Sequence, residues 1–290
     1  MSPFGNLCLA AALGLSIFAA ALSVAGARLG SARLVLAAQR AVYANFALIA
    51  AASFALVYMF LVHDFTNEYV WKHSDTTMPT QYLVTAWWGG MDGSMLFWLF
   101  WLSAFSAAAV FVNRNRYRQI LPYAAATLMT VSAFFCVLLL FETNPFRTFL
   151  VRVPTEGEGL NPLLQNPTMV IHPPNLYLGF VGMTVPFAFA MGALISGQLD
   201  GGWIKAIRRW TILAWMFLSC GNLLGGWWAY TELGWGGFWA WDPVENAAFM
   251  PWLTATAFLH SIMITERRGM LKVWNMVLVV LSFTLTLLGT

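Results

Sequence analysis

The amino-acid sequence predicts an all-α membrane protein, a polytopic bundle of about eight membrane-spanning helices. Of its 290 residues, 60% are hydrophobic and only 9% are charged, whereas soluble domains carry about 25% charged residues. This composition excludes a soluble globular protein, and it also excludes a disordered one, which needs low hydrophobicity and high charge. The net charge of +3 is too dilute to form a face that binds nucleic acid.

Eight uncharged apolar stretches are the expected spans, because a bilayer core about 30 Å thick needs about twenty apolar residues per helix. Together they form a single transmembrane domain over 1–290, at 7–27, 41–62, 95–112, 121–141, 174–195, 210–230, 244–264 and 273–290. The first stretch lacks a basic segment before it and is followed by Arg28, which predicts an uncleaved helix with its N-terminus outside. The chain stops at Gly289-Thr290 without a polar tail, which predicts a truncated or split polypeptide.

Charged residues separate into two sets of loops. The loops 28–40, 113–120, 196–209 and 265–272 hold twelve of the fifteen basic residues, and the alternating outer segments hold ten of the twelve acidic ones. Basic residues resist translocation and accumulate in cytoplasmic loops. The acidic loops, which are also rich in Trp, Pro and Gly, are therefore predicted to face outward and to carry the chemistry.

The segment 227–241 is the strongest candidate for a functional surface. Three glycines, at 234, 236 and 237, allow its backbone to lie close to a flat ligand while the indole rings present their faces. A porphyrin suits such a surface, although an interfacial aromatic belt or simple packing is the alternative. The five tryptophans are Trp227, Trp228, Trp235, Trp239 and Trp241.

The next four residues, Asp-Pro-Val-Glu at 242–245, predict the start of the seventh helix. Asp242 is expected at the N-cap, Pro243 at the first helical position and Glu245 at the third. Capping is therefore the expected role of both carboxylates on the residue pattern alone.

Three motifs make the chain recognisable. They are Trp-Ala-Tyr-Thr-Glu-Leu-Gly-Trp-Gly-Gly-Phe-Trp-Ala-Trp-Asp-Pro-Val-Glu-Asn-Ala at 228–247, Phe-Met-Pro-Trp-Leu at 249–253, and Asn-Pro-Leu-Leu-Gln at 161–165 followed by Ile-His-Pro-Pro at 171–174. With them the chain resembles the WWD family of membrane haem-handling proteins, and within it the N-terminal part of the CcmF haem lyases. The resemblance runs along almost the whole chain.

The resemblance implies a role in cytochrome c-type biogenesis. The outward-facing segment 227–246 would receive haem from a membrane-tethered, CcmE-like haem chaperone and position it for thioether attachment to Cys-x-x-Cys-His apocytochromes, as a haem lyase (holocytochrome c synthase) component. Implied cofactors are a resident intramembrane haem b, haem in transit on the outer face, and quinol as an electron source. CcmH-like and CcmI-like thiol-handling subunits are implied partners, in a bacterial inner membrane with the active face periplasmic.

Two histidines are candidate haem-iron ligands. His172 is expected outside, immediately before Pro173-Pro174 and the fifth helix, where the residues alone allow either a solvated histidine or a ligand. His260 lies seventeen residues beyond Pro243, about 25 Å into the membrane, and its alternative is a hydrogen bond to a helix carbonyl. The resemblance implies that His172 binds the haem in transit and His260 the resident haem. It also implies that the tryptophans and Asp242 contact haem, and that a second histidine for each site comes from the rest of the protein or from another subunit.

His63 and His73, in the first outer loop, are expected to be solvated. Two other functions remain open: a WWD protein that carries or exports haem without attaching it, and a transporter of another amphiphile such as a lipid or quinone. His260 argues against the first. The absence of Asp, Glu, Lys and Arg deep in any predicted span argues against the second.

Overall fold

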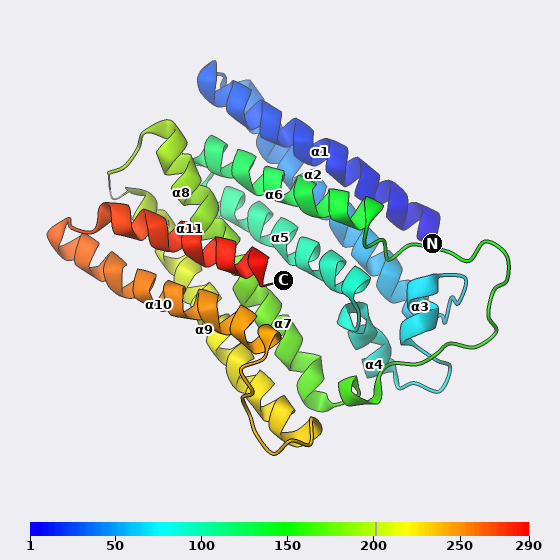
Figure 1. Ribbon diagram of the computed structural model, residues 1–290. Helices are drawn as coiled ribbons and strands as arrows, with labels where there is room; N and C mark the ends of the chain where they lie inside the picture. The colour runs from blue at the N-terminus through cyan, green and yellow to red at the C-terminus, as the bar shows by residue number, and fades with distance from the viewer. Residues whose placement is uncertain (201, 290) are drawn as a thin grey trace.

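The computed structural model describes residues 1–200 and 202–289, and this part of the chain folds as a helical bundle (Figure 1). The helices α1, α2, α5 and α6 pack side by side, α9, α10 and α11 form the opposite side, and α7 with α8 lie between them. The elements in order are α1 (Ser2–Arg28), α2 (Ala32–Leu61), α3 (Glu68–His73), α4 (Thr80–Thr85), η1 (Ala86–Trp88), α5 (Met91–Asn113), α6 (Leu121–Phe141), η2 (Pro162–Leu164), α7 (Pro167–Gly182), α8 (Thr184–Ser196), α9 (Gly202–Glu232), α10 (Pro243–Arg268) and α11 (Lys272–Leu288).

Seven segments of the described chain are long and apolar enough to cross a membrane, and these confirm the predicted all-α polytopic class. The segment Pro167–Ser196, which joins α7 and α8, is one of them. The predicted span 273–290 corresponds to α11, a shorter apolar helix of 17 residues, and its last residue lies outside the described residues. The count of eight crossings and the outer position of the N-terminus stay predictions.

Most helices extend beyond the apolar stretch that predicted them. α9 begins at Gly202, eight residues before the predicted start, because its first turns are amphipathic. Trp203, Ile204 and Ile207 are buried, whereas Lys205 and Arg208 face solvent. Hydropathy alone misses such turns, since their charges interrupt the apolar stretch.

A closed ring of polar side chains joins α1, α2 and α6 in the interior. The amide nitrogen of Asn45 donates to Ser16 Oγ at 2.7 Å and to the carbonyl of Ala12 at 2.9 Å. Ser16 donates to Ser132 Oγ at 3.2 Å, and Ser132 donates back to Asn45 Oδ1 at 3.3 Å. Every member is buried and paired, which is how small polar residues fasten helices in an apolar medium.

The predicted fifth span, 174–195, is wrong at its start and in its continuity. The helix begins at Pro167, with Asn166 as its N-cap, and it is interrupted at Met183. Pro173 cannot donate to the carbonyl of Met169, but the indole Nε1 of Trp88 lies 3.4 Å from that oxygen and donates to it. Pro186 explains the interruption, because its ring excludes the carbonyl four residues back, at Gly182.

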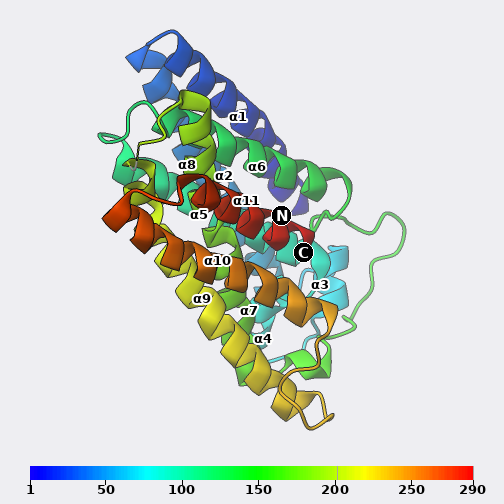
Figure 2. The same cartoon turned by 60° about the vertical axis from the view of Figure 1, so that its left-hand side comes forward.

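The loops predicted to face outward fold into a packed layer around Tyr69, at the end of the bundle where Figure 2 shows α3 and α4. The Tyr69 hydroxyl accepts a hydrogen bond from Gly90 N at 3.0 Å and lies 3.1 Å from the carbonyl oxygens of Ala86 and Trp87. Burial raises the pKa of Tyr69 far above its ordinary value. The phenol therefore stays neutral and holds the turn that starts α5.

His63 and His73 are not the solvated residues that the sequence predicted. His73 Nδ1 contacts the Tyr69 carbonyl at 2.9 Å, and its ring lies 4.2 Å from the Tyr69 ring. Burial lowers the pKa of His73. Nε2 of His63 is also buried, in a residue with φ of 52°. The prediction was wrong because this loop forms the helices α3 and α4, which cover the ends of α2 and α5.

Candidate functional site

The candidate site is built on a close approach of α7 and α9. Small residues make this contact: an added Cβ at Gly221 would lie 2.6 Å from Leu176 Cδ2, and one at Gly182 would lie 2.8 Å from the Ala214 Cβ. Gly221 and Gly225 are four residues apart, the small-xxx-small spacing that lets membrane helices approach closely. The two helices therefore pack backbone against backbone beside His172.

His172 lies within α7 and points at α9, which corrects its expected place in the loop before the helix. Its Nδ1 is 2.9 Å from the carbonyl oxygen of Gly221. A carbonyl oxygen can only accept, so Nδ1 carries a proton, and in the neutral imidazole Nε2 keeps a free lone pair. An added Cβ at Gly225 would lie 2.5 Å from His172 Cε1. The absence of a side chain at Gly225 therefore provides the space that the His172 ring occupies.

A small cavity of about 80 Å³ brings His172 together with three other predicted site residues, Trp228, Trp239 and Asp242. The rings of His172 and Trp228 are nearly parallel, with centroids 6.5 Å apart and planes 12° apart. Trp228 Nε1 donates to the carbonyl of Leu163 at 3.2 Å. The Asn-Pro-Leu-Leu-Gln motif at 161–165 thus holds the Trp228 ring, which faces His172.

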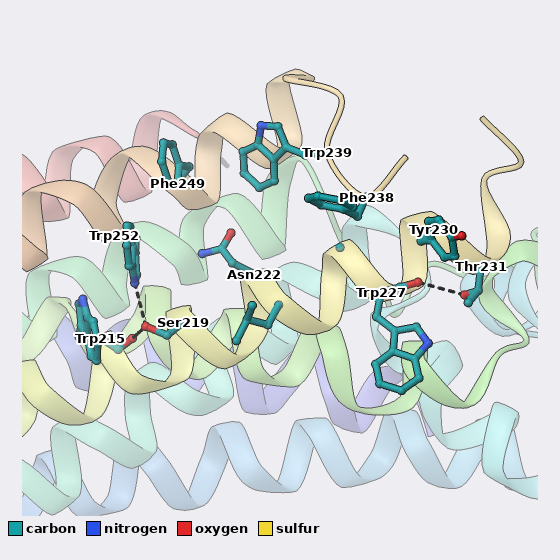
Figure 3. A pocket seen from close by; sticks show the side chains of 12 residues that line it. Trp215, Ser219, Asn222, Trp227, Tyr230, Thr231, Phe238, Trp239, Phe249 and Trp252 are labelled. Atoms are coloured by element: carbon teal, nitrogen blue, oxygen red, sulfur yellow. Dashed lines mark hydrogen bonds between the residues drawn. The ribbon is translucent and has the colours of Figure 1, made fainter. Parts of the chain in front are cut away.

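A second, larger cavity of about 980 Å³ opens between α9 and α10 (Figure 3). Its volume is at the upper end of the range for small-molecule sites, about 300–1,000 Å³. Trp252 Nε1 donates to Ser219 Oγ at 2.8 Å, and Trp215 Nε1 donates to Thr256 Oγ1 at 2.8 Å, so both indoles present ring faces with their N–H groups satisfied. The lining residues are Trp215, Ser219, Asn222, Leu223, Gly226, Trp227, Tyr230, Thr231, Phe238, Trp239, Phe249 and Trp252.

The two cavities lie on adjacent faces of α9 and share three lining residues, Asn222, Gly226 and Trp239. Trp239 reaches them from the loop before α10, where Figure 3 shows it opposite Asn222 and beside Phe249. Its ring makes an edge contact with Phe249 at 5.4 Å. One indole is therefore a wall of both spaces.

The five tryptophans do not form one continuous platform. Trp227 and Trp228 lie in the last turns of α9, about 100° apart on the helix, so the first faces the large cavity and the second faces His172. Trp235 folds over Gly237 and Trp241 is 67% exposed, and neither lines either of these two cavities. The sequence predicted the cluster, but it did not predict that the helix would divide it.

Asp242 is the N-cap of α10, as predicted. Its Oδ1 accepts from Glu245 N at 2.7 Å. Glu245 Oε2 accepts from Ala240 N at 2.7 Å, and Asn246 Nδ2 donates to the carbonyl of Trp241 at 3.0 Å. These bonds hold Trp241 at a positive φ of 58°. The polar residues after the motif therefore fix the loop that carries Trp239.

His260 lies apart from His172, on an exposed face of α10. Its Nδ1 is 2.8 Å from the carbonyl of Thr256 in its own helix. By the same reasoning as for His172, Nδ1 carries a proton, and in the neutral imidazole Nε2 offers a lone pair that points away from this bond. The imidazole thus needs no neighbouring helix to satisfy its donor.

Some residues of the site were missed by the sequence reasoning. Gly221 and Gly225 could have been found from their spacing in an apolar helix. Trp215 and Ser219 could not, because tryptophan and serine are ordinary residues of membrane helices. Trp252 belongs to the motif at 249–253, but only the pairing of α9 with α10 brings it to Trp215 and Ser219.

Fold and site define a polytopic α-helical protein of the membrane, with an aromatic cavity and a tautomer-fixed histidine between its later helices. The family described as Cytochrome C assembly protein matches residues 88–290. The chain belongs to this family.

Curated relatives match along the whole chain. It is 42% identical over 290 residues to "Cytochrome c-type biogenesis protein CcmF" of Haemophilus influenzae and 43% identical over 290 residues to the protein of that name in Escherichia coli, covering 100% of this chain and 45% of each relative. A solved structure, "Cytochrome c Heme Lyase CcmF", superposes with a TM-score of 0.87 at 34% identity, covering 99% of this chain and 46% of that one. The chain thus spans about half the length of these relatives. The apolar helices and the bacterial relatives define an integral inner-membrane protein.

Proposed function

We propose that this chain handles haem in cytochrome c maturation, as part of a haem lyase. It would take haem from a membrane-tethered chaperone and hold it for covalent attachment to a Cys-x-x-Cys-His apocytochrome, assisted by thiol-handling subunits. Thioether formation joins haem vinyl groups to cysteine thiols, and this chemistry belongs to haem and substrate. The contribution of the chain is to bind and orient.

One observation carries the proposal: the hydrogen bond from His172 Nδ1 to the Gly221 carbonyl. Iron-binding histidines almost always donate their second ring nitrogen to a carbonyl, carboxylate or water, which fixes the tautomer and strengthens the ligand. Trp228 and Trp239 supply ring faces beside this imidazole. The donor set fits a haem iron, although the 80 Å³ cavity is too small for the macrocycle and the loop carrying Trp239 would have to open.

His260 is proposed to hold a resident b-type haem. Its Nε2 is free by the same tautomer argument, and it projects from an exposed face of α10. Haem in transit would then bind at the acidic end of the bundle, which we place on the periplasmic side together with the N-terminus. The second axial ligands, and electrons from quinol, would come from outside the described residues.

The large cavity favours a second candidate function, transport or binding of a different amphiphile. None of its lining residues in the described chain is a histidine, an acid or a basic residue. A lipid or quinone tail would therefore find a suitable surface there without using His172.

The experiment that separates the two functions is His172→Gly in the complete maturation system. Loss of the imidazole should stop holocytochrome c formation while the resident b-type spectrum persists, and added imidazole should restore part of the yield by occupying the vacated position. Ile171→Ala, at the exposed neighbouring position on α7, is the matched control. Normal holocytochrome c formation by His172→Gly would reject the haem-handling role and favour the amphiphile.

A further inference from the structure

The end of the bundle opposite the haem-handling loops contains a cavity of about 470 Å³ that the proposed function does not use. Figure 1 shows this end, where the α1–α2 turn, the α5–α6 loop and the end of α8 come together. Arg114, Asn115 and Arg118 of the α5–α6 loop form its polar side, and Val35 and Leu36 of α2 form its apolar side. The cavity is therefore amphipathic, because arginine and aliphatic residues line it together.

Arg118 also lines a neighbouring cavity of about 310 Å³, together with Tyr123, Ser196 and Gln198. The guanidinium thus stands between two spaces that are rich in hydrogen-bonding groups. Arg114 is held in place differently: it donates to the carbonyl of Phe111, and its guanidinium carbon lies 4.0 Å from the centroid of the Phe111 ring. A guanidinium has five N–H donors, so both arginines keep several for a ligand.

The positive charge at this end is not neutralised by the protein. Six arginines cluster in these two loops and the adjoining helix ends: Arg28, Arg33, Arg40, Arg114, Arg116 and Arg118. Residues 1–63 and 93–141 contain no Asp or Glu. Within the described residues the one ion pair is Arg208–Glu266, which joins α9 to α10. There the Glu266 carboxylate lines a polar cavity of about 320 Å³ together with Arg208. The cavity beside Arg114 has no such partner.

The role of basic residues in setting membrane topology explains the positive charge at this end, but it does not explain why two of the arginines line a cavity. Retention of a loop in the cytoplasm needs only basic residues, in any solvated geometry. It does not need two arginines to share a cavity with aliphatic side chains such as Leu36, which is 48% exposed. A phosphodiester matches the guanidinium groups, and an acyl chain matches the aliphatic side chains.

We propose that this cavity binds the head group of an anionic phospholipid such as phosphatidylglycerol. Arg114 and Arg118 contact the phosphate, Asn115 lies beside the glycerol, and Val35 with Leu36 covers the first part of an acyl chain. Basic pockets between membrane helices bind anionic head groups by the same combination of charge and surface. The site is independent of the haem-handling role, because none of its residues lines either cavity of the candidate site.

The test compares phospholipid retention and thermal unfolding of the purified protein in detergent. Added phosphatidylglycerol should raise the Tm by several degrees, and equal amounts of phosphatidylcholine or inorganic phosphate should not. The double variant Arg114→Gln/Arg118→Gln should lose this rise, and its co-purified phosphatidylglycerol should fall at least about two-fold. Arg267→Gln/Arg268→Gln removes the same charge at the end of α10 and should behave as wild type.

A third variant separates loss of lipid binding from a change of membrane topology, which the removal of arginines could itself cause. Ala32→Trp fills the cavity from an exposed position on α2 and keeps all six arginines. It should lose the phosphatidylglycerol effect as well. The proposal is overturned if inorganic phosphate reproduces the Tm rise, if the Arg267/Arg268 control loses it equally, or if Ala32→Trp retains lipid like the wild type.

Discussion

At the scale of single residues, His172 and His260 share one feature, a hydrogen bond from Nδ1 to a helix carbonyl. Each donates Nδ1–H to a helix carbonyl, at 2.9 and 2.8 Å, and leaves Nε2 free. His172 uses the carbonyl of a neighbouring helix, so its ring is fixed to α9. His260 uses its own helix, so its ring depends on α10 alone.

Replacing His260 by Ala should remove the resident b-type haem from the purified complete protein. Loss of an orienting partner of a metal ligand costs about 10–100-fold in affinity, so loss of the ligand itself should cost at least about ten-fold. The pyridine haemochrome spectrum measures the haem. Ile264→Ala, one helical turn further and also exposed, should leave the haem content unchanged. Equal haem in His260→Ala and wild type would reject the ligand role.

At this scale the sequence named candidate residues, but it did not place all of them correctly in the fold. The four histidines were few enough to weigh one by one, and the motif marked His172 and Asp242. The sequence misplaced His172, because Pro173-Pro174 suits a helix start as well as Asn166-Pro167 does. The helix can begin at Pro167 because the Trp88 indole donates to the Met169 carbonyl, which Pro173 leaves without a donor. This contact joins residues 81 positions apart, so local sequence does not predict it.

At the scale of elements, the α7–α9 contact controls the candidate site. Gly225→Ala adds one methyl group that would lie 2.5 Å from His172 Cε1, closer than real Cβ contacts. The ring must leave its hydrogen bond to Gly221, so holocytochrome c should fall several-fold while the amount of membrane-inserted protein stays constant. Immunoblotting and haem staining of cytochrome c measure the two.

Gly14→Ala in α1 is the control for the same substitution in an open place, because a Cβ there meets nothing within 4 Å. Alanine also favours a helix over glycine, so this variant should mature cytochrome c normally. A Gly225→Ala protein with undiminished holocytochrome c would show that the His172 ring position is not needed.

The outer layer around α3 should lose stability as pH falls. Burial, with a smaller contribution from Lys72, lowers the pKa of His73 below 6.5, and the hydrogen bond to the Tyr69 carbonyl, Asp92 and Glu158 oppose this only in part. The unfolded layer therefore binds a proton near pH 6.5 that the folded layer does not, and stability decreases below about pH 6.5 until the folded pKa is reached. Hydrogen exchange of the α3 amides, corrected for the intrinsic exchange rate, should accelerate as the pH falls from 7.5 to 5.5. In His73→Gln the same comparison, corrected for intrinsic exchange, should show no such change, and an unchanged pH response there would contradict the assignment.

At this scale the helices were largely predictable and their ends were not. Twenty apolar residues identify a span from composition alone, and Asp242-Pro243-Val244-Glu245 identified the start of α10 correctly because capping is local. The early start of α9 at Gly202 depends on burial of Trp203 against other helices. The hydropathy criterion misses these turns, because it requires an uncharged stretch and Lys205 and Arg208 interrupt it.

At the scale of the whole molecule, this chain supplies one histidine to each proposed haem position. The 290-residue chain alone should therefore bind haem weakly and in a five-coordinate state, because iron in such sites usually takes two axial ligands. The visible spectrum and the haem-to-protein ratio measure this. Stoichiometric six-coordinate haem would contradict the expectation, and sedimentation would then show whether a dimer supplies His260 twice.

The wall shared by the two cavities has a thermodynamic consequence. Trp239 borders both the space beside His172 and the large space between α9 and α10. A molecule that moves this indole on entering one space changes the free energy of filling the other. By linkage the effect is reciprocal: whatever factor the first ligand imposes on the affinity of the second, the second imposes on the first. One side chain in a loop held by Asp242 and Glu245 thus makes the occupancies of the two spaces interdependent.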